Sequence, residues 1–140
     1  MYYKGNGVAQ DDREALHWFH LAADQGDARA QFNLGGMYFE AQGVPQDFAE
    51  AAKWWRIAAD QGYPQAQYNL GLWYAEGKGG SPDNIQAHMW LNLAAAGFLA
   101  SDSHGRDAAI RNRDVIANKM TTEQIAQAQK LAREWKPKPN

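Results

Sequence analysis

His17 and His20 lie three residues apart in a segment whose pattern predicts a helix, and on a helix this spacing can place two imidazoles on one metal ion. No third ligand lies near them in the sequence, and both flank Trp18 on a side that is expected to be polar. The pattern therefore favours two surface histidines, and we expect no metal site.

Ser101, Ser103 and His104 stand close together and could supply a nucleophile and a base. They lack the strand, turn and helix context of a nucleophile elbow, and no acid is placed to orient the histidine. The run 101–103 is more typical of a loop that starts a helix. The chain also has no cysteine, which excludes thiolate chemistry and disulfides. We expect no catalytic residue and no cofactor.

Three aspartates recur at equal distances and could be interpreted as an acidic site. They are Asp11, Asp47 and Asp83, and the residues three positions later are Glu14, Glu50 and Gln86. This is the spacing of a capping box, in which the first side chain accepts from free N–H groups of the first helical turn and the second reaches back. Capping explains the series without a metal or a catalytic role.

The aspartates belong to a repeat of 36 residues. Residues 1–36 and 37–72 are identical at 19 of 36 aligned positions, and a third copy ends one residue early, at Gly97. A period of this size indicates an array whose units stack on their neighbours. The large aromatic residues of the repeat are Trp18, Trp54, Trp90, Tyr38 and Tyr74. We expect them to fill the interfaces between helices rather than to bind a ligand.

Each repeat unit is expected to contain two antiparallel helices. The predicted first helices cover about 28–40 and 64–76, and the predicted second helices about 11–25, 47–61 and 83–96. Gly26, Gly62 and Gly97 are expected to close the second helices in the left-handed conformation. The segments 5–7 and 77–80 are expected to be glycine turns.

Two further helices, over about 107–118 and 121–135, are expected to close the array. The last one would place Ile125, Ala132, Trp135 and either Ala128 or Gln129 toward the body. Its other side is polar, as the end of a solenoid requires.

A single domain is therefore predicted for residues 1–140. It would consist of a partial repeat over 1–27 that lacks most of its first helix, repeats over 28–63 and 64–97, and terminal helices with a cap over 98–140. Since Met1 aligns with Met37, near the end of a first helix, we expect the chain to be part of a longer array.

Charge and hydropathy exclude several partners. The net charge is −2, with 6 Lys and Arg against 11 Asp and Glu in residues 1–100, and 8 against 5 in residues 101–140. No basic stripe is available for a nucleic acid. No apolar run is long enough for a membrane span, and no signal peptide is visible at residues 1–5. The compartment stays open, and both cytoplasm and periplasm are compatible with the sequence.

With its repeat residues aligned, the chain resembles the Sel-one-like repeat (SLR) family, a relative of the tetratricopeptide repeats. The residues that carry the resemblance are Ala30, Leu34, Gly35, Tyr38, Gly43, Val44, Asp47, Ala51, Trp54, Ala58, Ala59 and Gly62. The resemblance implies an all-α fold, a right-handed α-solenoid superhelix. It also implies an adaptor for protein complexes that catalyses no reaction, often in bacterial envelope biology or host interaction. Ala41, Gly80 and Leu91 depart from the pattern, and we expect looser packing at Leu91.

The resemblance also implies that the first helices line a concave groove. The residues that it places there are Arg29, Phe32, Asn33, Gly36, Phe39 and Glu40, followed by Gln65, Tyr68, Asn69, Leu72, Ala75 and Glu76. Phe32 and Tyr68 would form an aromatic ladder. Asn33 and Asn69 would bond either to the backbone of a bound peptide or to the neighbouring repeat.

Some related domains hold a terminal carboxylate with Lys, Asn and Arg on this surface. Here Phe32, Tyr68, Gly36 and Leu72 stand at the corresponding places, so the groove favours an extended or helical protein segment with apolar anchors.

Two alternatives remain open. A few cysteine-rich relatives have been linked to hydrolysis of β-lactams, but the cysteines and a serine–lysine arrangement are missing here. Self-association is the other, because the partial first repeat would leave apolar surface of the helix around Trp18 and Phe19 uncovered. The sequence therefore predicts an interaction module, with a homodimer formed through the N-terminal end.

Overall fold

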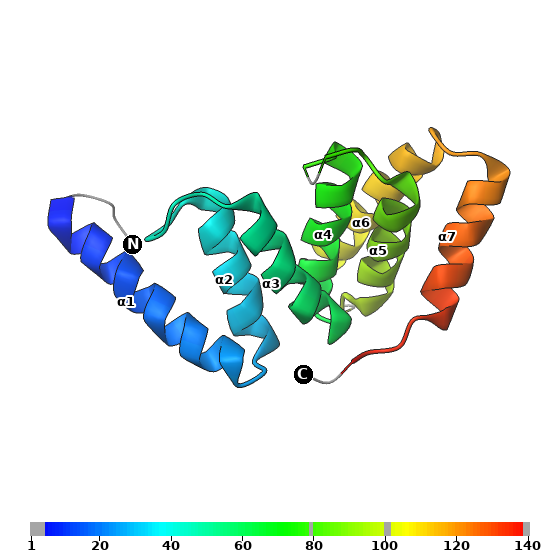
Figure 1. The fold of residues 1–140 in the computed structure, drawn as a ribbon. Coiled ribbons are helices and arrows are strands. Elements are labelled where there is room, and N and C mark those ends of the chain that lie inside the picture. Colours follow the sequence, from blue (N-terminus) through cyan, green and yellow to red (C-terminus); the bar gives the residue numbers. More distant parts are fainter. Residues whose placement is uncertain (1–4, 79, 100–101, 139–140) are drawn as a thin grey trace.

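The computed structural model describes residues 5–78, 80–99 and 102–138, and the regular structure in this part of the chain is entirely helical. The helices are α1 (Gly5–Asp24), α2 (Ala28–Glu40), α3 (Phe48–Asp60), α4 (Pro64–Glu76), α5 (Asn84–Gly97), α6 (Ser103–Ala117) and α7 (Thr122–Glu134). α1 to α5 follow one another along a row, α7 lies beyond α5, and α6 lies behind α4 and α5 (Figure 1). The predicted α-solenoid is confirmed.

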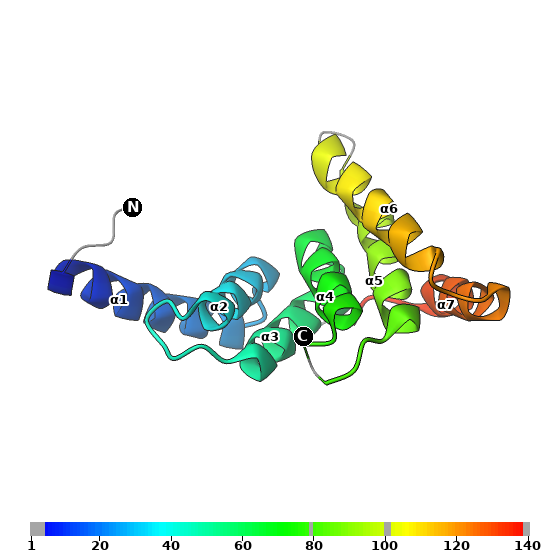
Figure 2. The same ribbon diagram turned by 90° about the horizontal axis from the view of Figure 1, so that it is seen from above.

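The helices pack in sequential pairs. α2 packs against α3 and α4 against α5, while α3 contacts α4 and so joins the two pairs. Seen from above, the row is curved, with α2, α4 and α6 on its inner side (Figure 2). α5 contacts α6 and α7 as well as α4, so it is the central helix of the C-terminal half. No helix in the described part of the chain is long and apolar enough to cross a membrane.

The aspartates that precede α3 and α5 act as caps, as predicted. Asp47 accepts from the N–H of Glu50, and Asp83 accepts from the N–H of Gln86, each at 3.0 Å. Glu50 instead lies 3.6 Å from the ammonium of Lys53. The complete capping box is at the start of α7, where both reciprocal bonds between residues 121 and 124 are present.

Two predicted helix starts are wrong. α1 begins at Gly5, so 5–7 is helical rather than a turn, and Asp11 lies inside the helix instead of capping it. α6 begins at Ser103, four residues before the predicted start, because Asp102 accepts from the N–H of Gly105.

The ends of the helices match the glycine pattern only in part. Gly26 and Gly62 have φ values of 94° and 92°, as expected for left-handed residues. Gly97 does not have a positive φ: it is the last residue of α5, and Phe98 follows it in an extended conformation. A Cβ at position 97 would lie 3.3 Å from Pro64, so the glycine allows close packing there. Ala41 ends α2 with φ 60°, although it carries a Cβ. A non-glycine residue pays a steric penalty there.

The recurring tryptophans do not share one environment. Trp54 is 8% exposed and Trp90 1%, as expected, but Trp18 is 63% exposed. Each buried indole is covered from the preceding second helix, Trp54 by the ring of His20 on α1 and Trp90 by Arg56 on α3. The described chain has no helix before α1, so Trp18 has no such cover. Trp18 therefore fills no helix interface in the described chain, unlike the other recurring tryptophans, and its exposure agrees with the uncovered apolar surface expected on this helix.

The C-terminal end is sealed by α7 and the segment after it. Ala128 is fully buried, which decides between the two predicted inward residues, since Gln129 is exposed. The ring of Trp135 lies edge-on to that of Trp90, with centroids 6.4 Å apart. Lys138 then donates its N–H to the carbonyl oxygen of Asp60 at 2.6 Å. The segment thus returns to α3, beneath α5 in Figure 1.

Candidate binding groove

A groove of about 470 Å³ opens between α2 and α4. Its lining residues are Phe32, Asn33, Gly36, Phe39, Glu40, Gln42, Trp55, Asn69, Leu72, Trp73, Glu76 and Lys78. The aromatic and aliphatic side chains come from three helices, whereas the charged ones gather where α2 and α4 end. The groove is therefore apolar in its body and charged at one end.

Eight of the residues that the sequence assigns to a groove line this one. They are Phe32, Asn33, Gly36, Phe39, Glu40, Asn69, Leu72 and Glu76. The structure brings them together because α2 and α4 are equivalent helices one repeat apart, and α3 holds them side by side.

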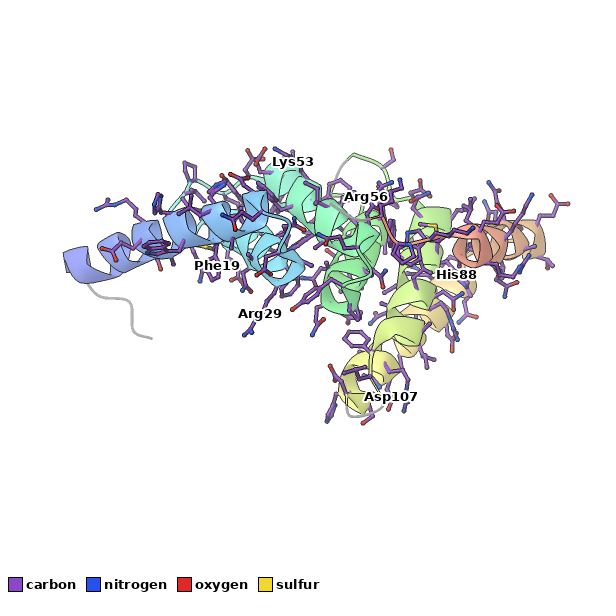
Figure 3. All side chains as sticks on the ribbon, turned by 90° about the horizontal axis from the view of Figure 1, so that it is seen from below. Phe19, Arg29, Lys53, Arg56, His88 and Asp107 are labelled. Carbon is purple, nitrogen blue, oxygen red and sulfur yellow. The ribbon has the colours of Figure 1, made fainter. Side chains whose placement is uncertain are left out.

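Four of the predicted residues lie elsewhere, and one of them, Ala75, packs against the buried cluster of Ala87, Leu91 and Ile116. Arg29, at the start of α2, lines a separate hollow together with Trp18 and Phe19. Figure 3 shows Arg29 and Phe19 on the same side of the molecule. Gln65 lines a hollow near Phe98, at the start of α4. Tyr68 packs against residues of α5 and α6.

The predicted aromatic ladder is not continuous. The ring of Phe32 lies 5.5 Å from that of Tyr63, measured between centroids. Tyr68 packs with Ala87, Leu91 and Ile116, and its hydroxyl accepts from the amide of Asn112 at 3.1 Å. Each ring therefore has its own neighbours, and Tyr68 belongs to the contact between α4 and α6.

The side-chain amides of Asn33 and Asn69 both line the groove. Among the residues that the structure describes, neither amide has a hydrogen-bond partner, although both are half-buried. The sequence left open whether they bond to the neighbouring repeat, and no such bond is present in the described part. Each amide can donate and accept toward a molecule in the groove.

Sequence reasoning missed four lining residues: Gln42, Trp55, Trp73 and Lys78. Lys78 lies with its ammonium 5.6 Å from the ring centroid of Phe39 and 3.5 Å from a carboxylate oxygen of Glu76. It comes from the loop after α4, at the position equivalent to Gln42 one repeat earlier, whereas only helix residues were expected in the groove. Trp55 also contributes to the packing of α3 on α2, since its Nε1 donates to the Phe32 carbonyl.

The two histidines of α1 are not a matched pair. His17 is exposed, whereas the Nε2 of His20 is 3.3 Å from the hydroxyl of Tyr38, and its ring also contacts Trp54. The expectation of a surface residue is therefore wrong for His20. Burial, followed by the charges of Glu50 and Asp47, raises the pKa of Tyr38 above 10.0. In the described chain, no three His, Asp or Glu side chains are grouped to hold a metal ion.

Comparison with known proteins adds two kinds of match. The Sel1 repeat matches residues 1–27, 28–63 and 64–97. The structure is similar to that of a protective antigen of uropathogenic Escherichia coli strains that displays an SLR fold, with 35% identity and a TM-score of 0.77 over 88% of this chain. It is also similar to a Sel1 repeat protein from Oxalobacter formigenes, with 38% identity and a TM-score of 0.61 over 63% of this chain. The chain spans 25% of the length of each. No curated protein matches it.

Proposed function

The chain belongs to the Sel1 repeat family, and from this premise we propose that it binds a segment of a partner protein in the groove between α2 and α4. Sel1 repeats are generally protein–protein interaction modules, and the fold is typically a non-catalytic scaffold. We propose that this chain, too, acts without catalysis.

The observation that carries this proposal is that the groove is lined both by apolar side chains and by side-chain amides without hydrogen-bond partners in the described chain. Phe39 and Leu72 stand on opposite sides of the groove and offer apolar surface to an anchoring side chain. The amides of Asn33 and Asn69 lack partners in the described chain and are placed to bond to the backbone of a ligand. Tight peptide binding requires a few ligand side chains that become buried, together with hydrogen bonds to the backbone of the ligand.

The two asparagines offer the cleanest test because they contribute no hydrogen bond to the described fold. We expect the double variant Asn33→Ala and Asn69→Ala to keep its thermal stability and to lose partners that the wild type retains in a crosslinking pull-down. A matched control replaces Gln127 and Gln129, two exposed residues of α7, by alanine. If the asparagine variant retains every partner, the groove is not the binding site.

A second candidate function is self-association through α1. On this helix Trp18 is 63% exposed and Leu21 44%, so an apolar stripe faces solvent. Exposed apolar surface of this kind marks an interaction site. We propose a second copy of this chain as its occupant, with the two α1 helices antiparallel.

Charge complementarity favours that arrangement. Arg13 and Asp24 are exposed, and they are equally distant in sequence from the midpoint between residues 18 and 19. Eleven residues are about three helical turns, so both lie on the same flank of the helix. In an antiparallel pair of helices related by a two-fold axis, the same flank of each helix lies against that flank of the other. Arg13 of each copy then faces Asp24 of the other.

Analytical ultracentrifugation over a range of concentrations tests this pairing. We expect the wild type to dimerise, Arg13→Asp to weaken the dimer, and the double swap Arg13→Asp with Asp24→Arg to restore it. A wild type that remains monomeric at high concentration contradicts self-association. A double swap as weak as the single variant contradicts the antiparallel register.

A further inference from the structure

Gly36 has no structural reason to be a glycine. It lies in the middle of α2 without a positive φ, and a Cβ added to it would meet nothing within 4 Å. Its neighbour Gly35 differs, because a Cβ there would overlap the indole of Trp55. A glycine inside a helix is destabilising relative to alanine. The fold therefore carries this cost without any gain in packing.

The missing side chain leaves a gap in the groove. Phe32 lies one helical turn before Gly36 and Phe39 about one turn after it, so both rings flank the gap on the same wall. In the next repeat the equivalent position is Leu72, whose side chain lines the facing wall. The gap is thus bounded by two phenyl rings and one aliphatic side chain, and it suits a large apolar side chain from a ligand.

The end of the groove is negatively polarised. Glu40 and Glu76 are the last residues of α2 and α4, and both helices direct the carbonyl ends of their backbones to this place. Lys78 is the one cation of the lining, and it pairs with Glu76. Glu40 is exposed and has no ion-pair partner among the described residues. A cation brought by a ligand would therefore complete the charge balance.

We propose that the groove selects a protein segment that places a large apolar side chain over Gly36 and a lysine or arginine beside Glu40. This inference rests on the proposed function of the groove. Four residues of α2 separate the two positions, which is about 6 Å along the helix axis. The two ligand side chains are therefore two positions apart in an extended segment and four apart in a helical one.

Selection from a random twelve-residue phage-displayed peptide library tests the proposal without a known partner. On the wild type we expect enriched peptides that combine Phe, Trp, Leu or Ile with Lys or Arg at one of those spacings. Gly36→Leu fills the gap, and we expect it to weaken binding of a selected peptide about tenfold or more. Glu40→Gln should weaken it about two- to fivefold, and added salt should remove that difference.

Thermal unfolding separates these effects from misfolding. Gly36→Ala should unfold at a higher temperature than the wild type and still bind the selected peptide less well, whereas the control Gln129→Leu on α7 should leave binding unchanged. Enriched peptides that are acidic, or that bind Gly36→Leu as well as wild type, overturn this inference and leave the groove as a binding site. If no peptide is enriched on the wild type, the proposed function fails together with it.

Discussion

The indole of Trp55 lies against the backbone of Gly35, where any side chain would overlap it. α2 and α3 approach each other this closely only because residue 35 is a glycine. The indole Nε1 also donates to the carbonyl oxygen of Phe32 at 3.2 Å. Gly71 and Leu91 repeat the relationship one unit later, and Leu91 is fully buried, so the looser packing expected there is absent.

Replacement of Gly35 and of Gly36 by alanine should therefore have opposite effects on stability. We expect Gly35→Ala to lower the free energy of unfolding by about 1–3 kcal/mol, because the rigid indole must move. Gly36→Ala should raise it by up to about 1 kcal/mol, because helix propensity improves in open space. Urea unfolding followed by circular dichroism measures both. Equal effects at the two positions would contradict the contact described above.

The protein should be more stable with glycine than with alanine at position 41. Its φ of 60° costs an alanine about 1–2 kcal/mol, whereas a glycine adopts it freely. Part of that gain is offset by the larger entropy of glycine in the unfolded chain. We expect Ala41→Gly to raise the free energy of unfolding by about 0.5–1 kcal/mol. The reverse change at the equivalent loop position, Gly77→Ala, should be destabilising, since a Cβ there would also press on Pro82.

The first helices of the repeat were predictable to the residue because two signals coincide in them. Ala28–Glu40 and Pro64–Glu76 are aligned copies, and each has turn residues at both ends. α1 was not predictable in this way, since its sequence carries the glycines of a loop. A loop is held by the helices on both of its sides, and local residues alone do not specify it.

The groove could be predicted only where it follows the repeat. Equivalent positions of stacked repeats face the same side of the array. This holds for Asn33 and Asn69, and for Gly36 and Leu72, which all line the groove. Tyr68 does not line the groove like its equivalent Phe32, because α6 departs from the repeat sequence and its Asn112 donates a hydrogen bond to the Tyr68 hydroxyl. Gln42 and Lys78 are also equivalent positions, but they lie in the loops after α2 and α4, and the expectation was restricted to residues of the first helices.

The three equivalent tryptophans should differ in their contribution to stability. We expect Trp54→Ala and Trp90→Ala each to lower the free energy of unfolding by about 3–5 kcal/mol, because both indoles are buried. Trp18→Ala should change it by less than about 1 kcal/mol at a concentration where the chain is monomeric, since the side chain is largely exposed. Differential scanning calorimetry at low concentration compares the three. A large loss at Trp18 would show that its indole is covered.

Acidification should destabilise the fold through His88. The side chain is 4% exposed, its Nδ1 has no hydrogen-bond partner in the described chain, and it lies on α5. Burial, and then the guanidinium of Arg113, lower the pKa of His88 below 6.5, while Asp114 acts in the opposite direction. The unfolded chain therefore binds a proton more readily than the folded one. The contribution of His88 to stability is fully present above pH 6.5 and is lost as the pH falls through the lowered pKa.

Urea unfolding at pH 7.5 and at pH 5.5 measures this linkage. In His88→Gln, which cannot be protonated, we expect the loss of stability between the two pH values to be smaller than in the wild type. His17→Gln, at an exposed position, should show the same loss as the wild type. Equal losses in all three proteins would mean that His88 takes up its proton without cost, and that its surroundings admit water when it does so.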